Sequence, residues 1–598
     1  MKSLAYLNKF FYKYRWRLIP GVCFVVISNI FGVLPAQVIR VAFNLVSENI
    51  QIYHLYAGFD RQQIIYDIFG SSLLLFGALV LVLSLLRGLF LFFMRQTIIL
   101  MSRHIEYDLK NEIYQHYQEL SLAFFRRHNT GDLMNRATED VSRVRMYLGP
   151  GIMYAINTIV LFVLTVYAML SVNGRLALFA LMPMPVLVLS IYYVNNLIEF
   201  RSEKIQERLS SLSSFVQENI SGIRVVKSYV REAYISKKFT EESENYKMHS
   251  MALTKVQALF FPMMLLLVGI SNVLIIYIGG IEVMKGNITS GNIAEFVVYL
   301  NQLMFPVMSL GWVTSLIQRA AASQKRINEF LHERPEVQSP KVAARQVKGQ
   351  IVFDRVSFVY PDTGIEALKE VSFTVEPGQM LAIIGRTGSG KSTIANLMMR
   401  MYDTTGGEIQ IDGTPLPQLN LNAYRSQVGF VPQEVFLFSD TIAHNIAFSA
   451  DVLDRSAVEQ AAKNAAVYGN IIELEKGFDT LIGERGITLS GGQKQRVSIA
   501  RAIVKQPQIL VFDDCLSAVD TRTEEEILRN LGRIMNGKTS IIIAHRISTI
   551  RNADKILVMD NGIITEQGTH DELMAQKGDY FELYEKQLLE EQETPPAI

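Results

Sequence analysis

The chain has 598 residues, of which 49% are apolar and 19% are charged, so it is too long for one small domain and poorer in charge than a typical soluble protein. A mean hydropathy of +0.19 predicts two unlike halves, one in a membrane and one in water. The net charge of +1 excludes a general electrostatic attraction to nucleic acid. The two cysteines, Cys23 and Cys515, provide neither a disulfide framework nor a metal-ligand cluster, and we predict that both are buried.

Six apolar stretches before residue 320 are long enough to cross a bilayer as helices, which takes about 20 residues. The apolar cores of four carry no charge, the second contains Arg87 and Arg95, and the sixth contains Pro306. The predicted spans lie at about 18–43, 68–97, 147–172, 175–198, 256–282 and 292–320.

Basic residues predict the orientation of these spans, because they resist translocation. Lys and Arg are frequent in the N-terminal arm and in the segments 98–146 and 199–255, whereas the alternate loops carry only Arg61, Arg175 and Lys285. Both termini and the two long segments are therefore predicted to be cytoplasmic. Helical spacing in these segments predicts that the spans continue into the cytoplasm and reverse near 122–132 and 217–226, where they could contact a cytoplasmic domain.

The sequence changes character after residue 330. Residues 331–349 form a polar linker, and from residue 350 short apolar strands alternate with helices, as in a soluble α/β domain. The predicted fold is an α-helical polytopic membrane domain over 1–330, with long cytoplasmic extensions, followed by an α/β phosphate-loop domain over 350–589. Residues 590–598 form a tail.

A glycine-rich loop follows the apolar strand 380–385. The segment GRTGSGKST opens a helical stretch, which is the context that a phosphate-binding loop requires. Backbone N–H groups and the helix N-terminus attract phosphate, a lysine adds positive charge, and a serine hydroxyl can ligate magnesium. The residues assigned to this loop are Gly385, Arg386, Thr387, Gly388, Ser389, Gly390, Lys391, Ser392 and Thr393.

A second motif, QILVFDD (508–514), predicts a buried strand that ends in two carboxylates. Beside a phosphate loop, Asp513 is suited to hold magnesium and Asp514 to act on the attacking water. A third motif, LSGGQ (489–493), precedes a helix, so that its serine and glycine amides offer another anion-binding helix N-terminus.

These motifs, with Gln433 in VPQEVF, SAVD (517–520) and AHR (544–546), resemble the ATP-binding cassette (ABC) family. With six preceding spans, the whole chain resembles a half-transporter of the exporter type, and in particular the aspartate-bearing half of bacterial heterodimeric multidrug exporters. The segment GERG (483–486) matches the exporter segment that meets the cytoplasmic ends of the membrane helices.

The resemblance implies a role for several single residues. Tyr360 would stack on adenine, Gln433 would sense magnesium and the water, His545 would contact the γ-phosphate, and Asp520 would communicate between facing domains. The signature of one chain would complete the ATP site of another. The expected catalytic residues are Asp514, His545, Gln433 and Lys391, the magnesium ligands are Ser392, Gln433 and Asp513, and the signature residues at the ATP site are Ser490, Gly491, Gly492 and Gln493.

The sequence departs from the family pattern at Asp514, where a glutamate is usual. Aspartate is one methylene, roughly 1.5 Å, shorter, and a misplacement of about 1 Å can slow a reaction on the order of 100-fold. We therefore expect slow hydrolysis at this site and favour a heterodimer with a second half-transporter. Because Lys391, Gln433 and His545 match the family pattern, a homodimer that hydrolyses ATP slowly remains an alternative.

We expect an ATPase that exports or flips a hydrophobic or amphipathic compound across a bacterial inner or plasma membrane by alternating access. The alternatives are an ATP-gated channel or regulatory protein, which uses binding rather than turnover, and a lipid A-type flippase. Phe305 and Met308, rather than basic residues, flank Pro306, which argues against a phosphate-bearing lipid. The fused layout disfavours an importer. The candidate substrate residues are Arg87, Phe305, Met308 and Trp312.

Overall fold

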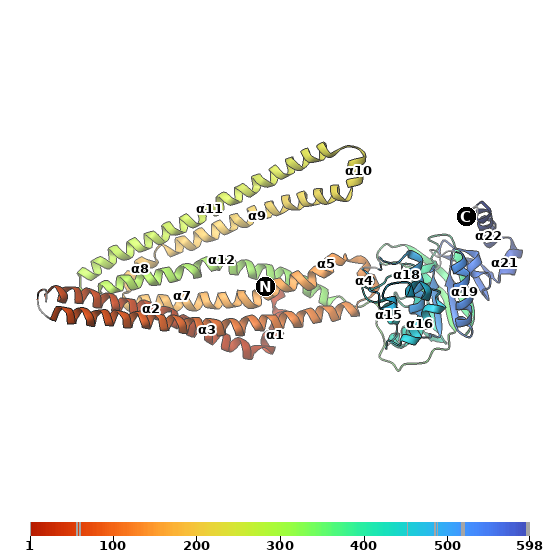
Figure 1. Ribbon diagram of the computed structural model, residues 1–598, viewed down its shortest axis with the longest axis horizontal. Coiled ribbons are helices and arrows are strands. Elements are labelled where there is room, and N and C mark those ends of the chain that lie inside the picture. Colours follow the sequence, from red (N-terminus) through yellow and green to blue (C-terminus); the bar gives the residue numbers. More distant parts are fainter. Residues whose placement is uncertain are drawn as a thin grey trace. The chain divides into compact units, whose positions relative to one another are not determined.

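The computed structural model describes residues 2–55, 58, 61–450, 452–483, 486, 488–515 and 521–593 (Figure 1). The chain divides into two compact units. The first contains Met1–His116 and Gly131–Glu333, and the second contains Tyr117–Thr130 and Arg334–Ile598.

Long helices build the first unit. Within the described residues, six helical segments are long and apolar enough to span a membrane. A 59-residue helix such as α3 extends for roughly 90 Å, far beyond the hydrocarbon core of a bilayer. The long helices are α2 (Arg15–Leu55), α3 (Arg61–Glu119), α7 (Ile152–Val172), α9 (Met184–Ser221), α11 (Glu232–Met284) and α12 (Ser290–His332); shorter ones are α1 (Asn8–Lys13), α5 (Thr130–Asn135), α6 (Val141–Met146) and α8 (Gly174–Leu181).

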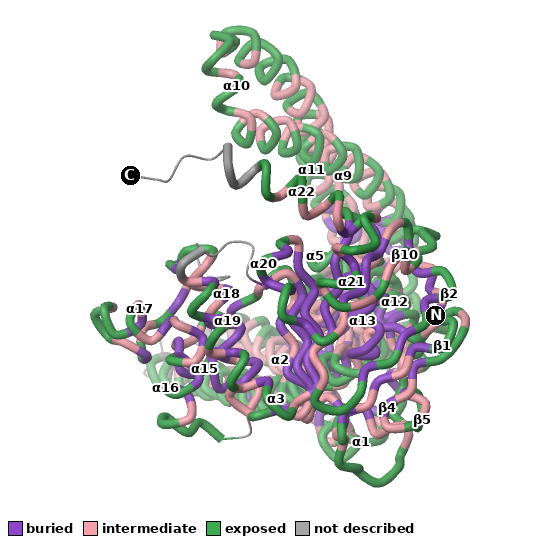
Figure 2. Tube along the Cα trace, turned by 90° about the vertical axis from the view of Figure 1, so that its right-hand side faces the viewer, coloured by how far each residue is buried: buried purple, intermediate pink, exposed green. Residues whose placement is uncertain are grey.

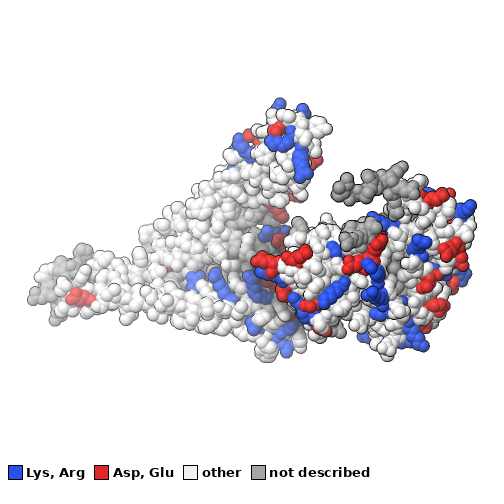
Figure 3. Space-filling view, turned by 45° about the vertical axis from the view of Figure 1, so that its right-hand side comes forward, with Lys and Arg blue, Asp and Glu red and all other residues white. Residues whose placement is uncertain are grey.

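Helix α12 lies at the centre of this unit, packed against α2, α7 and α11. Its buried residues Phe296, Leu300, Leu303 and Val307 recur every three or four positions and form one apolar face. Charged side chains are sparse along most of the long helices and gather at the end formed by α10 (Ile223–Ser228), as Figure 3 shows. This distribution matches the apolar spans and the basic segments that the sequence predicts to be cytoplasmic.

A buried carboxylate joins α2 to α12. The side chain of Glu295 is completely buried and accepts hydrogen bonds from the Tyr299 hydroxyl, at 2.9 Å, and from Asn292 Nδ2, at 3.1 Å. Arg40 of α2 lies 3.3 Å from the same carboxylate. Its charge is therefore both paired and hydrogen-bonded, as a buried charge requires.

The two predicted cytoplasmic reversals correspond to α4 (Leu122–Arg127) and α10. Helix α4 belongs to the second unit, where Ala123 packs into the hydrophobic core. Helix α10 has no buried residue among those described (Figure 2). The prediction that both cysteines are buried holds for Cys515 and is wrong for Cys23: the apolar residues of α2 surround the helix, and those facing away from α7 and α12 stay uncovered.

The second unit contains two sheets. The larger has the order β10-β9-β3-β8-β7-β6, parallel from β9 to β6 with β10 antiparallel at one edge; the smaller is antiparallel with the order β2-β1-β4-β5. The strands are β1 (Ile351–Val359), β2 (Glu366–Val375), β3 (Met380–Gly385), β4 (Gly406–Ile411), β5 (Thr414–Pro415), β6 (Val428–Val431), β7 (Ile509–Asp513), β8 (Thr539–Ile543), β9 (Lys555–Asp560) and β10 (Ile563–Gly568).

The parallel strands of the larger sheet are buried on both faces, which is why they are largely apolar runs, whereas the edge strand β10 has no buried residue. In β7, Ile509 and Val511 enter one hydrophobic cluster, whereas Leu510 and Phe512 enter the other. The buried strands form the centre of this unit in Figure 2. The helices are α13 (Lys391–Met398), α14 (Leu421–Ser426), α15 (Ile442–Ala447), α16 (Arg455–Asn464), α17 (Tyr468–Ile472), α18 (Gly491–Ile503), α19 (Thr521–Met535), α20 (Ile547–Ile550), α21 (His570–Gln576) and α22 (Asp579–Glu593).

Replacing Glu295 with alanine should destabilise the first unit. The Glu295→Ala change leaves Arg40, Tyr299 and Asn292 without their shared acceptor, so the free energy of unfolding should fall by about 3 kcal/mol. Thermal unfolding of the full chain in lipid nanodiscs measures the effect. Glu48→Ala, at an exposed position of α2, is the matched control. Equal melting temperatures for both variants would contradict the prediction.

Candidate functional site

Four neighbouring parallel strands, β3, β8, β7 and β6, end at one edge of the larger sheet. The glycine-rich loop follows β3, Asp513 ends β7, and Gln433 and His545 come shortly after β6 and β8. Ligands of open α/β sheets bind at the carboxyl ends of the strands. The predicted residues therefore line one cleft although the sequence separates them widely.

The loop after β3 has the backbone of a phosphate cradle. Gly390, the N-cap residue of α13, has φ +99°, a conformation that favours glycine, and a Cβ there would collide with the Ala367 carbonyl. A Cβ on Gly385 would likewise collide with the Met559 carbonyl. Among the described residues, the buried Ser389 hydroxyl has no hydrogen-bond partner. The loop therefore offers the α13 N-terminus and an unused hydroxyl to an anion.

The Lys391 ammonium group is folded onto this loop. Its Nζ donates to the carbonyl oxygens of Gly385, at 2.9 Å, and Arg386, at 2.8 Å. Burial lowers the pKa of Lys391, while the nearby charges of Asp514 and Asp513 oppose that shift. A phosphate would give this buried cation a charged partner in place of two neutral carbonyls.

Ser392 and Asp513 supply a pair of oxygen donors beside the loop. The Ser392 hydroxyl donates to Asp513 Oδ1 at 2.9 Å. Burial raises the pKa of Asp513 to about 6, the hydrogen bond from Ser392 lowers it, and the neighbouring Asp514 charge adds to the rise. Magnesium is usually held by one or two carboxylates, a few other oxygens and the phosphates of its nucleotide. This donor set fits magnesium better than it fits a metal that needs an all-protein cage.

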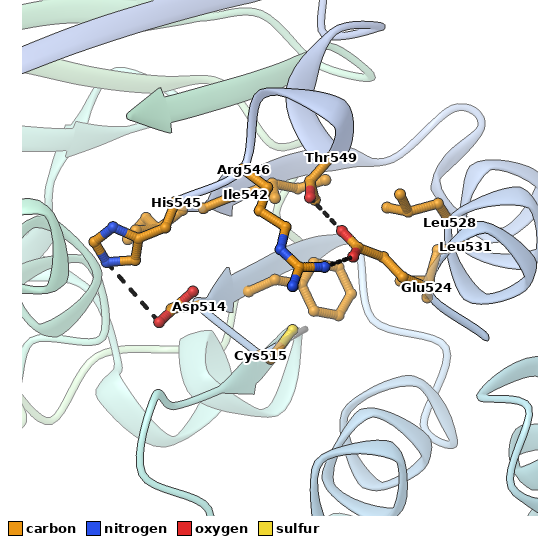
Figure 4. Close-up of a pocket in the computed structure, with 12 residues that line it drawn as sticks. Asp514, Cys515, Glu524, Leu528, Leu531, Ile542, His545, Arg546 and Thr549 are labelled. Atoms are coloured by element: carbon orange, nitrogen blue, oxygen red, sulfur yellow. Dashed lines mark hydrogen bonds and ion pairs between the residues drawn. The ribbon is translucent and has the colours of Figure 1, made fainter. Parts of the chain in front are cut away.

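Asp514 lies between two of the other predicted catalytic residues. His545 Nε2 lies 3.9 Å from Asp514 Oδ2 (Figure 4). Gln433 Nε2 donates to the same oxygen at 3.3 Å. The Asp514 backbone has φ +45°, an uncommon conformation for a residue other than glycine. The structure therefore brings the short carboxylate, the glutamine and the histidine together.

Tyr360 lies at the other end of the cleft, where its hydroxyl shares a 3.0 Å hydrogen bond with the Thr393 hydroxyl. Arg126 of α4 lies over this ring, with its guanidinium carbon 5.0 Å from the ring centroid. Its NH1 donates to the Tyr402 hydroxyl at 3.3 Å, and its Nε lies 3.3 Å from Asp362. An aromatic ring and a planar cation thus frame one end of the cleft.

The signature residues lie apart from this cleft. Ser490 caps α18: its hydroxyl accepts from the Gln493 N–H, and its own N–H donates to the Gln493 side chain. Ser490 and Gly491 are exposed, and neither Gly492 nor Gln493 lines the cleft. Asp520, and Glu484 and Arg485 of GERG, lie outside the described residues.

The substrate candidates fall into two places in the first unit. Phe305, Met308 and Trp312 are exposed along one face of α12, and Tyr154 of α7 lies next to two of them, with ring centroids 6.1 Å from Phe305 and 5.3 Å from Trp312. Arg87 lies instead against α2, where a Cβ on Gly32 would approach its guanidinium carbon to 3.2 Å.

Sequence reasoning did not assign Arg126 to the nucleotide cleft, although it predicted the reversal that carries this residue. It also missed Glu524 of α19. This buried carboxylate accepts from the Arg546 guanidinium at 2.7 Å and from the Thr549 hydroxyl at 2.5 Å, next to His545 (Figure 4). The apolar spacing of α19 could have indicated that Glu524 faces the core, because Ile527 and Leu531 follow it at helical intervals.

Comparisons with known proteins agree with this arrangement. Residues 18–307 match the ABC transporter transmembrane region, and residues 368–517 match the ABC transporter family. The multidrug resistance-like ATP-binding protein MdlA of Escherichia coli K12 is 34% identical over 99% of this chain and 97% of its own length. An ATP-dependent lipid A-core flippase of Syntrophus aciditrophicus is 34% identical over 86% of this chain and 85% of its own. The solved structure of a bacterial Atm1-family ABC exporter with ATP bound has a TM-score of 0.73 and 28% identity, and the match covers 98% of this chain and 99% of that one.

A membrane unit of six spanning helices fused to a phosphate-loop α/β unit defines a half-transporter of the exporter type. The chain belongs to the ABC transporter family. The predicted family and fold class are therefore confirmed. So is ATP-driven export: the protein is an integral membrane ATPase that binds ATP and works as a dimer.

Replacing Arg126 with alanine should weaken ATP binding about threefold to tenfold, because a cation stacked on an aromatic system contributes about 0.5–2 kcal/mol. The Arg126→Ala change removes the group that frames the ring of Tyr360. Titration of the full chain in nanodiscs with a fluorescent ATP analogue measures the affinity. Arg127→Ala is the matched control, because Arg127 of the same helix pairs with Glu336 instead. Tighter binding by Arg126→Ala would show that the guanidinium occupies the position of the base.

Proposed function

We propose that this chain is the weakly hydrolysing half of a bacterial inner-membrane exporter of hydrophobic or amphipathic compounds, with both termini and the ATP-binding unit in the cytoplasm. The observation that carries this proposal is the position of Asp514 between Gln433 and His545. The relatives whose names indicate multidrug resistance support the substrate class.

The nucleotide site divides into three functions in this proposal. Tyr360 stacks on the adenine, the loop from Gly385 to Thr393 and Lys391 hold the phosphates, and the groups around Asp514 act at the γ-phosphate. Ser392, Asp513 and Gln433 would hold Mg²⁺, which neutralises charge on the phosphates when bound. The 2.9 Å contact between Ser392 and Asp513 supports the first two of these ligands.

Asp514 is the general base of the proposed hydrolysis, and its short side chain makes the step slow. The carboxylate accepts a proton from the attacking water, Gln433 orients that water, and His545 contacts the γ-phosphate. An aspartate must approach the water more closely than a glutamate would, and the hydrogen bond from Gln433 holds its carboxylate. Binding of ATP would still close the two ATP-binding units.

In the proposed heterodimer, each chain would supply the signature that completes the ATP site of the other. Ser490 and Gly491 of the LSGGQ signature are exposed and apart from the chain's own cleft, so they are available to the site of a second chain. At the α10 reversal, Ile220, Ile223, Val225 and Tyr229 are exposed and apolar, although this end lies far from the apolar spans in the sequence. Such a surface favours contact with another protein chain. In the proposed pair, Asp520 communicates between the facing units.

The proposed substrate path follows the exposed face of α12. Phe305, Met308 and Trp312 provide an aromatic and polarisable surface that suits varied apolar compounds. Arg87 is the charged residue among the proposed substrate residues. Its side chain forms no ion pair with the described residues, so it is available to a charged substrate. Acidic amphipathic compounds would give it a counterion.

The ATPase rate of the purified chain tests the heterodimer. In nanodiscs without a partner, the wild-type chain should hydrolyse ATP no faster than Lys391→Ala. Asp514→Glu should exceed that control about 10-fold or more, since the longer side chain restores roughly 1.5 Å of reach. A wild-type rate well above the control would show a competent homodimer and contradict the proposal. If Asp514→Glu is also inactive but folded and able to bind ATP, a different partner chain is required. The ATP-gated or regulatory function is then favoured only if the chain with its partner also fails to hydrolyse ATP.

The substrate path is tested by transport. Trp312→Ala should reduce uptake of neutral and acidic amphipathic dyes into inverted vesicles alike, several-fold, because it removes apolar contact area. Arg87→Ala should reduce only the uptake of acidic dyes, because it removes the counterion. Both measurements use the chain with its partner if Asp514→Glu shows that one is required. Equal losses of both dye classes in the Arg87 variant would indicate a packing role against Gly32.

A further inference from the structure

The C-terminal helix α22 is hydrogen-bonded to the main chain around His545 through the side chain of Gln587. Gln587 Nε2 donates to the His545 carbonyl at 2.6 Å, and Gln587 Oε1 accepts from the Ile547 N–H at 2.9 Å. One amide side chain therefore binds the backbone on both sides of Arg546. This contact joins segments 42 residues apart, and no motif of the sequence contains Gln587.

The groups that Gln587 binds need a partner. Ile547 begins α20, a helix of one turn, and its N-cap residue, Arg546, makes no side-chain capping hydrogen bond. Ile547 is buried, so its N–H would be costly to leave unpaired. Although Gln587 belongs to another helix, its side chain provides the hydrogen-bond acceptor that a capping side chain would provide at the start of α20. The His545 carbonyl lies beyond the end of β8 and outside the hydrogen bonds of the sheet.

Helix α22 is fixed firmly enough to hold this position. At its start, the N–H groups of Asp579 and Tyr580 donate to the carboxylate of Glu566, and the Tyr580 ring is completely buried. Leu583 and Tyr584 pack against the hydrophobic core of the same unit. Positions 580, 583, 584 and 587 share one face of a helix, so the packing that anchors α22 also directs Gln587 at His545.

The segment from His545 to Thr549 is also restrained on the side that faces α19. Glu524 binds the side chains of Arg546 and Thr549 there (Figure 4). That contact fixes α20 and the Arg546 side chain, whereas the Gln587 amide fixes the backbone of His545 itself. The imidazole lies 3.9 Å from Asp514, so a small displacement of this backbone changes its approach to a γ-phosphate.

We propose that Gln587 is a positioning residue for His545, through which the C-terminal helix sets the contact between the histidine and the γ-phosphate of ATP. The inference rests on the proposed role of His545. Loss of the Gln587 amide leaves the nucleotide site folded and the adenine and β-phosphate contacts intact, but it weakens the contact that distinguishes ATP from ADP. A change that displaces the end of α22 therefore alters ATP recognition without touching the nucleotide.

The test compares ATP and ADP affinities of the full chain in nanodiscs, a readout that does not depend on turnover. Gln587→Met keeps the size of the side chain and removes both hydrogen bonds. ATP should bind about threefold to tenfold more weakly, as expected for one lost contact, and ADP should bind as in the wild type. Gln587→Glu keeps the acceptor for Ile547 N–H but turns a carboxylate toward the His545 carbonyl, so it should lose ATP affinity at least as much. Lys586→Ala, one exposed position away, is the control and should bind both nucleotides normally.

His545→Ala separates this inference from the proposed function. If His545→Ala loses the preference for ATP while Gln587→Met keeps it, the positioning role is overturned and the role of His545 stands. If His545→Ala keeps the preference, the proposed role of His545 fails, and this inference fails with it. Equal losses of ATP and ADP affinity in Gln587→Met, with a lowered melting temperature, would show a merely structural contact and would also overturn it.

Discussion

The ends of four parallel strands at one edge of a sheet determine the chemistry of this protein. Because β3, β8, β7 and β6 are neighbours, the phosphate loop, His545, Asp513, Asp514 and Gln433 meet without any local sequence relation. The four strands are buried on both faces, so a close-packed core holds their ends and the residues that follow them. Conformations such as φ +99° at Gly390 and +45° at Asp514 persist because this frame over-determines them.

The membrane unit obeys a different constraint, namely that backbone polar groups must be satisfied where water is absent. Long helices meet it within each segment, and side chains then join the helices. The Asn29–Asn157 and Thr158–Ser309 hydrogen bonds, at 2.9 and 2.8 Å, link α2 to α7 and α7 to α12. Such polar contacts connect helices whose apolar faces are as compatible with lipid as with one another.

The sequence allowed prediction of the elements whose signal is local. Six apolar runs predicted six spans, and the strand, glycine loop and helix around Lys391 predicted a phosphate site. The LSGGQ serine predicted a helix start, and Ser490 indeed caps α18. These features depend on hydrophobic length, glycine conformation and capping, which neighbouring residues determine.

The residues that could not be predicted act across long separations in the sequence. Arg126 binds a hydroxyl 276 residues away, and Gln587 binds a backbone 42 residues away. An arginine in a basic segment and a glutamine in a polar helix look like ordinary solvated side chains, and only tertiary packing gives them partners. The exposed state of Cys23 was missed for a related reason: an apolar run does not tell which side of a membrane helix other helices cover.

These two distant residues differ from the strand-end residues in what they can transmit. The phosphate loop follows a buried strand of the rigid sheet, whereas Gln587 acts on the main chain at His545, beyond the end of β8. Arg126 lies on α4, whose chain continues directly into the long helices of the membrane unit, and Gln587 lies near the end of the last helix. Because Arg126 lies over the ring of Tyr360 and Gln587 binds the main chain at His545, a displacement of either element would alter the position of one of these two cleft residues. Differential contacts of this kind are what couples a ligand to a conformational equilibrium, since a ligand bound equally in both states shifts nothing. In the proposed function, the contacts to the adenine and to the γ-phosphate are therefore the ones that can couple ATP binding to a conformational change.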